Sequence, residues 1–158
     1  MVRRSGRTSG KLKVLESSGE VRLTTWVQLM KTYLVLHKEV AAYVAEHDMT
    51  IAQFDVMASL SYGEGLTQQD LASRLLVTKG NICGLLDRLE RVGWVERRAD
   101  SGDARVNRVF LTQVGRRKIE GVLPEHDRLV GELFRALSVA EASQLRELLA
   151  TIERNCGA

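Results

Sequence analysis

The stretch from Thr67 to Thr112 constrains the fold more than any other part of the chain. Two short segments with helical spacing of apolar residues meet there at a tight junction. Two segments with strand-like alternation follow, separated by a charged loop that contains Asp, Ser and Gly. Two helices, a strand, a loop and a strand in this order are typical of a winged helix–turn–helix.

The first helix of this stretch has a recognisable start. Thr67 is a good N-cap, and Asp70 stands three residues later, where its side chain returns to the cap. Leu66 and Leu71 fit the apolar staple across the first turn. We expect this helix to run to about Leu76.

The second helix is amphipathic and begins after a second cap, Thr78. Its apolar face has Ile82, Leu85, Leu86 and Leu89, and its other face has Lys79, Gly80, Asn81, Cys83, Gly84, Asp87 and Arg88. A polar face without bulk at two positions suits close approach to a DNA groove. We expect Lys79 and Asn81 to read the major groove and Thr78 to position the DNA backbone. An ordinary surface helix is the alternative.

A hairpin follows this helix. Gly93 fits a helix C-terminus, and alternation predicts strands at 94–97 and 105–111. The loop between them is too polar for a core, and Arg105 suits the negative potential of a narrow minor groove. We expect Arg98 to help to position the DNA backbone. The alternative is a solvated hairpin tip.

The residues of this region resemble the MarR family of bacterial transcriptional regulators. The resemblance rests on LLDRLERVGWVERR in the second helix and first strand, DSGDAR in the loop, RVFLTQVGRRK after it, and the C-terminal LSVAEASQLRELLATIER. It covers roughly residues 22–155. It implies that Asp103 braces the wing through Arg88, and that Arg105 enters the minor groove. Gly102 stands where many members have arginine, so one phosphate contact is missing.

The expected fold is mainly α with a small β-wing (α+β), a winged helix–turn–helix at about 50–112 with a helical dimerisation region. Dimerisation helices are expected at about 20–47 and 113–156, in one domain spanning 20–158, after a flexible basic arm at 1–19. Thr50–Gln53 and Ser138–Glu141 predict two further capped helices, and Pro124 should interrupt the helical stretch that ends near residue 137.

The terminal helices have more apolar surface than one wing domain needs, and a second copy of the chain would cover it. A two-fold dimer places two recognition helices about 34–36 Å apart, which predicts a pseudo-palindromic double-stranded DNA site. The resemblance implies the same homodimer, and it favours a repressor that a small ligand releases.

The resemblance also implies a small aromatic or phenolic acid as the effector, bound near the dimer helices. An aromatic body with a polar tip suits such a ligand. The residues expected to line the pocket are Trp26, Tyr33, His37, Asp55 and Met57. Packing of Tyr33 and His37 inside a helical core is the alternative. Urate is not expected, because the recognition helix lacks the arginine that urate-responsive members use.

Nothing in the chain predicts catalysis. The motifs for metalloproteases, phosphate-binding loops and dinucleotides are absent, the three histidines lie far apart, and neither a metal nor a cofactor is expected. A net charge of +3 fits a nucleic-acid partner. Two cysteines make no disulfide framework and no apolar run reaches membrane length, so we expect a cytoplasmic, nucleoid-associated protein without a membrane partner.

Two other functions fit the same residues. A non-switching architectural protein would use the same basic surface without an effector. A thiol-based redox regulator would use Cys83, whose oxidised form would clash with DNA on the groove-facing side of the helix.

Overall fold

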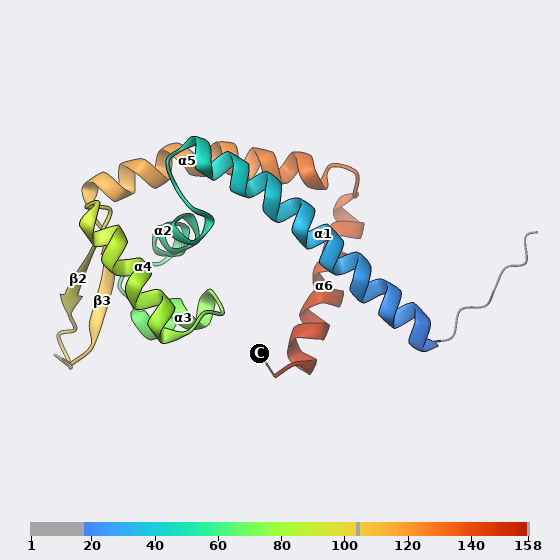
Figure 1. Ribbon diagram of the computed structural model, residues 1–158, viewed down its shortest axis with the longest axis horizontal. Coiled ribbons are helices and arrows are strands. Elements are labelled where there is room, and N and C mark those ends of the chain that lie inside the picture. The colour runs from blue at the N-terminus through green and yellow to red at the C-terminus, as the bar shows by residue number, and fades with distance from the viewer. Residues whose placement is uncertain (1–17, 104, 158) are drawn as a thin grey trace, which may run out of the picture. The chain divides into compact units, whose positions relative to one another are not determined.

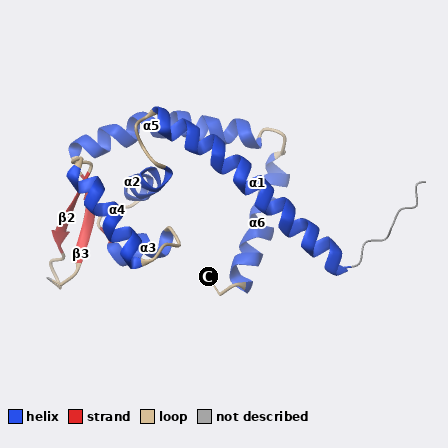
Figure 2. Cartoon of the chain, viewed as in Figure 1, coloured by secondary structure: helices blue, strands red, loops and turns tan. Residues whose placement is uncertain are grey.

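The computed structural model describes residues 18–103 and 105–157. Within them lie six helices and a three-stranded antiparallel sheet, which confirms the expected fold class (Figure 1; Figure 2). The elements are α1 (Ser18–Glu46), α2 (Ile51–Tyr62), β1 (Leu66–Thr67), α3 (Gln68–Arg74), α4 (Lys79–Arg91), β2 (Val95–Ala99), β3 (Asn107–Leu111), α5 (Gln113–Phe134) and α6 (Val139–Asn155).

The chain divides into two compact units, residues 1–35 and residues 36–158. The first unit holds the N-terminal part of α1. The second unit holds the rest of α1 and every other element, including the whole winged region. Most of the expected basic arm, residues 1–17, lies outside the described residues, and α1 begins at its end with Ser18.

Side-chain caps begin the helices where the sequence predicts them. Capping boxes are formed by Thr50 with Gln53, Thr67 with Asp70, and Ser138 with Glu141. Each satisfies backbone N–H groups that would otherwise have no partner in the first turn of a helix. In the second box the hydrogen bonds of the Thr67 backbone and hydroxyl to the Asp70 carboxylate hold the pKa of that carboxyl below its usual value.

The turn between α3 and α4 begins earlier than expected. α3 ends at Arg74, and Leu76 takes a left-handed backbone with a φ of 51°. Its side chain is 80% exposed, so it neither packs in the core nor continues the helix. Thr78 then accepts a hydrogen bond from the Asn81 backbone N–H and caps α4 as predicted. A non-glycine residue in this conformation stores roughly 1–2 kcal/mol of strain.

The sheet has the strand order β1–β3–β2, with β3 in the middle. β2 pairs with β3 from Val95 opposite Leu111 to Ala99 opposite Asn107, so the hairpin is longer on its first strand and shorter on its second than predicted. The two-residue strand β1 pairs with Val109 and Arg108 and was not predicted. A strand this short has no alternation to detect in the sequence.

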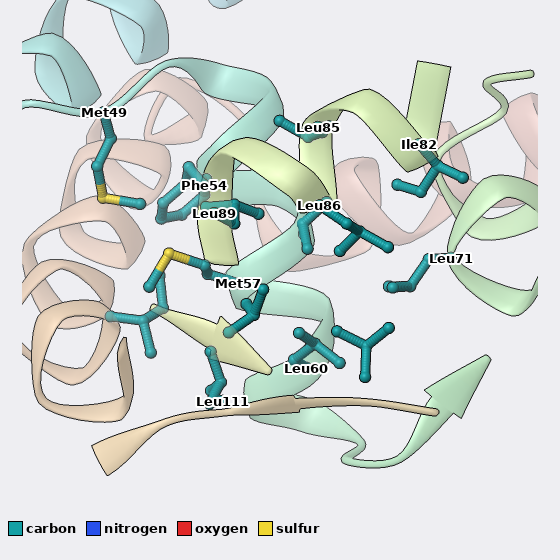
Figure 3. Packing of buried hydrophobic residues seen from close by; sticks show 14 of the residues in the cluster. Met49, Phe54, Met57, Leu60, Leu71, Ile82, Leu85, Leu86, Leu89 and Leu111 are labelled. Atoms are coloured by element: carbon teal, nitrogen blue, oxygen red, sulfur yellow. The ribbon is translucent and has the colours of Figure 1, made fainter. Parts of the chain in front are cut away.

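One core connects the winged elements of the second unit. α2 and α4 contribute four buried residues each, more than any other element, and β3 closes one side (Figure 3). The four apolar residues predicted for the inner face of α4, Ile82, Leu85, Leu86 and Leu89, are all buried. Figure 3 shows Leu86 and Leu89 of α4 close to Phe54 and Met57 of α2. α4, the expected recognition helix, is therefore held by its apolar face, and its polar face is left outside.

α5 is continuous through Pro124, so the predicted interruption is wrong. Proline removes the N–H that would bond the carbonyl of Glu120, one turn earlier. Glu120 and Pro124 are both exposed, and water can satisfy the carbonyl there. A proline on the solvent side of a long helix is tolerated for this reason.

α5 begins against the backbone of the residue before β2. Thr112 caps the helix, and its N–H and hydroxyl also donate to the carbonyls of Trp94 and Gly93. Gly115 is buried in the first turn, and a Cβ added there would lie 1.8 Å from the Trp94 carbonyl oxygen. Only glycine allows this approach, which joins α5 to the sheet.

Candidate nucleic-acid interface

The exposed side of α4 is polar at its N-terminal end. Lys79, Gly80 and Asn81 are all exposed immediately after the Thr78 cap. A Cβ at Gly80 would meet nothing within 4 Å, and one at Gly84 would meet only the Arg88 guanidinium at 3.8 Å. Neither glycine is required by packing within the described residues. Because neither has a side chain, a partner could approach the backbone of α4 closely at both positions.

Cys83 lies half-buried at the edge of this face, toward α3. Its thiol donates a hydrogen bond to Oε1 of Gln68 over 3.0 Å. Its backbone carbonyl accepts a hydrogen bond from the guanidinium of Arg97 over 3.2 Å. Cys83 therefore touches α3 through its side chain and β2 through its backbone.

Arg97 joins α4 to the wing, a role that was not predicted from the sequence. Its guanidinium donates to Asp87 at 2.8 Å and to Glu90 at 2.7 Å, and its backbone N–H donates to Glu90 at 2.9 Å. The Arg97 side chain is only 19% exposed. The available signal was its place in the strand, because Val95 and Arg97 share the inward face and a charge there needs a partner.

The tip of the wing is braced differently from the expectation. Asp103 accepts hydrogen bonds from the backbone N–H and the guanidinium of Arg105, at 3.0 and 2.9 Å. This guanidinium and the backbone N–H lower the pKa of the Asp103 carboxyl. The expected brace through Arg88 is wrong, because the guanidinium of Arg88 lies beside Gly84 on the recognition helix. The Arg105 side chain is 90% exposed, so its pair with Asp103 is open to solvent.

The base of the wing has a second brace, which was not predicted from the sequence either. Asp100 pairs with Arg108 and accepts hydrogen bonds from the backbone N–H groups of Gly102 and Asp103. These contacts, with the Arg108 guanidinium foremost, hold the pKa of Asp100 below its usual range. Arg108 also donates to the carbonyl of Gly65 over 2.8 Å and so links the wing to the segment before α3.

Arg98 leans back onto the sheet. Its guanidinium lies 4.6 Å from the centre of the Phe110 ring and pairs with Glu96. The side chain remains 61% exposed. It therefore presents a positive charge on the outer surface of β2, at a position fixed by an aromatic ring beneath it.

The five residues predicted to line an effector pocket lie in different compact units of the chain. Met57 is fully buried in the core, and its place in a ligand pocket stays a prediction. α2 is apolar around most of its circumference, and periodicity could not tell its inner side from a pocket wall. Trp26 and Tyr33 belong to the first unit, where both are more than half exposed.

Asp55 and His37 belong to the second unit. Asp55 is half-buried, and this burial raises the pKa of its carboxyl, against a smaller opposing effect of His126 and His37. Asp55 and Arg88 line a hollow of about 220 Å³ between α2, the α3–α4 turn and α4. The hollow also includes Asn81 and Leu85, so an occupant would touch the recognition helix itself.

The part of the chain that the structure describes has neither a candidate membrane span nor a candidate metal site. No helix there combines the length and the apolar character needed to cross a membrane. No group of three or more His, Cys, Asp or Glu side chains there is arranged to hold a metal ion.

The model of the MarR family matches residues 47–106 of the chain. The HTH-type transcriptional regulator YkoM of Bacillus subtilis is 34% identical over 105 residues, which make up 66% of this chain and 68% of that protein. The MarR family transcriptional regulator AbsC of Streptomyces coelicolor has a similar structure, with a TM-score of 0.81 and 21% identity over 89% of this chain and 95% of that one. A mutant of E. coli MarR in complex with operator DNA gives a TM-score of 0.76 and 27% identity, over 86% and 98% of the two chains.

The fold, the exposed recognition helix and the braced wing define a DNA-binding transcriptional regulator of the winged helix–turn–helix class. The relatives are transcriptional regulators rather than enzymes. Within that class, the chain belongs to the MarR family.

Proposed function

We propose that the protein is a repressor that binds a pseudo-palindromic operator as a homodimer and leaves it when a small aromatic or phenolic acid binds. The observation that carries this proposal is the exposed polar face of α4, with glycine at two positions, next to a wing that exposes Arg105. An α-helix of this kind fits the major groove, and an arginine on a hairpin fits the adjacent minor groove.

In the major groove, Lys79 and Asn81 read base edges, because they are the exposed donors of the first turn of α4. Thr78 positions the DNA backbone at the cap, and Arg88 adds a positive charge one turn beyond Gly84. Cys83 lies in the same helix at the edge of this surface.

On the wing, Arg105 enters the minor groove. It exchanges its solvent-exposed partner Asp103 for the strong negative potential of the groove. Asp103 holds the guanidinium at the wing until DNA arrives, since it binds both the backbone and the side chain of Arg105. Arg98, fixed over Phe110, contacts a phosphate outside the groove.

The dimer is supported by unpartnered apolar surface. On α6, Leu145, Leu148, Leu149 and Ile152 are between 36% and 57% exposed, although they share one helical face. In the first unit, Leu23, Trp26 and Leu34 on α1 are each more than half exposed. Surface of this kind favours a stable contact with a second copy of the chain.

The effector site is proposed at the hollow that Asp55 and Arg88 line. Arg88 offers a positive charge to an acidic ligand, and Leu75, Val77 and Leu85 offer apolar contact to its ring. His37 interacts electrostatically with Asp55 from α1 and adds a polar group on that side. A ligand there displaces α4 directly, and the affinity for DNA falls because the helix no longer fits the groove.

Selection of random duplex DNA by the purified protein at near-physiological salt, followed by sequencing, tests the proposal. We expect a pseudo-palindrome with half-sites about 10 base pairs apart, one turn of the duplex. Retention without sequence preference would support an architectural protein instead, and no retention would refute DNA binding by this surface. The selected duplex then serves as the probe, and benzoic and salicylic acid as first ligands, in a release assay.

A further inference from the structure

A second hollow lies between the recognition helix and the wing, on the side of α3. It has a volume of about 330 Å³ and is bounded by Gln68 at the start of α3, Lys79 at the start of α4, and Arg105 and Asn107 at the wing. Its described lining provides two cations, amides and one hydroxyl, and none of these described residues is a carboxylate. A hollow with these groups suits a phosphate oxygen rather than a cation or an apolar ligand.

Gln68 is oriented for this purpose by a neighbour outside the hollow. The thiol of Cys83 donates to Oε1 of Gln68, so the amide oxygen is turned toward α4. The two N–H groups on Nε2 of the same amide then remain available to an acceptor in the hollow. The hydrogen bond from Cys83 therefore fixes Nε2 of Gln68 as the group that donates there.

The course of DNA over this surface brings a phosphate to the same place. A recognition helix in the major groove and a wing in the adjacent minor groove lie on opposite sides of one DNA strand. That strand must cross the surface between Lys79 on the helix and Arg105 on the wing. The hollow is located between these two residues.

We infer that the hollow receives one phosphate of the DNA strand that passes between the two grooves. Gln68 donates its amide N–H to the phosphate and Asn107 closes the wing side. The positive charge of Lys79 at the edge of the hollow attracts the phosphate while its side chain reaches the base edges. Cys83 is a positioning residue, which acts through Gln68 and needs no oxidation. The inference rests on the proposed function, and it assigns a sequence-independent contact that fixes the register of the recognition helix.

The first test replaces Gln68 by a residue of the same size that a phosphate repels. Gln68→Glu is compared with Gln113→Glu, a matched control at the exposed first residue of α5, beyond the opposite end of β3 from the wing. We expect Gln68→Glu to bind the selected operator about tenfold or more weakly than the control, by fluorescence anisotropy, with a similar factor on random duplex. Equal affinities for the two variants would overturn the inference.

The second test locates the phosphate on the DNA. Operators with a single neutral methylphosphonate are made at each backbone position and bound to the wild-type protein. We expect one position per half-site, between the two grooves, where neutralisation weakens binding by wild type but not by Gln68→Glu. The contact is absent if no position shows this difference.

The third test addresses Cys83. Serine keeps a hydrogen-bond donor and alanine removes it, so Cys83→Ser should retain the methylphosphonate effect and Cys83→Ala should lose it. A purely structural role for Cys83 would change the unfolding midpoint but leave the effect at that one phosphate. If the alanine variant keeps the effect, Cys83 does not position Gln68.

Failure of the inference and failure of the proposed function give different results. If the wild-type protein binds no duplex, the proposed function is wrong. If the wild type binds its operator and Gln68→Glu binds as tightly as Gln113→Glu, only the phosphate contact is wrong.

Discussion

Gly115 gives the sharpest test of how the wing is attached to the rest of the fold. In Gly115→Ala the new Cβ would stand 1.8 Å from the Trp94 carbonyl oxygen and 2.7 Å from its carbon. Both atoms are backbone, so no side chain can rotate away. The first turn of α5 must move by more than an ångström, because real Cβ contacts are longer than 3.0 Å.

The cost can be estimated from what this movement breaks. Overpacking of this kind costs about 3 kcal/mol at the upper end of its usual range. The hydrogen bond from the Thr112 N–H to the Trp94 carbonyl is lost as well, at about 1 kcal/mol. Alanine is the better helix former by about 1 kcal/mol, which offsets part of the loss. We therefore expect a net destabilisation of about 3 kcal/mol.

Gly121→Ala is the matched control, because Gly121 lies in the same helix and a Cβ there would meet nothing within 4 Å. It should stabilise the protein by about 0.5–1 kcal/mol. Urea unfolding followed by tryptophan fluorescence measures both variants at one fixed protein concentration, as an oligomer requires. The midpoint should fall by about 1 M or more for Gly115→Ala and rise for Gly121→Ala. The reasoning is refuted if both variants shift in the same direction.

Five other substitutions test four separate parts of the structure. Arg105→Ala should weaken operator binding by about 1–3 kcal/mol in an anisotropy titration, and an unchanged affinity would mean that the wing does not touch DNA. Arg97→Met and Glu90→Gln should each destabilise the fold, and their double-mutant cycle should give a coupling of about 1 kcal/mol, with additivity as the contrary result. Leu76→Asn should raise the free energy of unfolding by about 1 kcal/mol, because asparagine tolerates the left-handed backbone and the exposed leucine loses little contact. Since the folded-state pKa of Asp70 is depressed, its contribution to stability is present above pH 3.8 and is lost as the pH falls through the lower folded value. Asp70→Asn should therefore unfold with a weaker pH dependence between pH 5 and 2 than the wild type, and equal dependence would contradict the assignment.

The sequence predicted the features that depend on neighbours along the chain. The caps at Thr67 and Thr78 and the buried face of α4 are local patterns, and the structure confirms them. A cap needs only residues three apart, and an amphipathic face needs only a period of 3.6. The helix that carries the candidate site was predictable for this reason.

Contacts between distant elements were not predictable in this way. Arg97 meets Glu90 across the junction of α4 and β2, and Arg108 meets Gly65 across 43 positions of sequence. Which charges pair there depends on strand register, which no local pattern in one sequence specifies. The expected partner of Asp103 was Arg88 on the recognition helix. Asp103 instead binds Arg105, two positions along the chain, because the wing turn brings these two residues together.

The position of β3 between β1 and β2 has a mechanical consequence. β1 runs directly into α3, and β2 follows α4 after three residues. The two helices α3 and α4 are therefore connected to the two strands that pair with opposite edges of β3. A force on the wing is shared between the β1–β3 and β2–β3 hydrogen bonds and reaches α3 and α4 together. The surface formed by α3, α4 and the wing therefore moves as one rigid body. In the proposed dimer, an effector that displaces α4 would therefore move β2, β3 and α3 together with it.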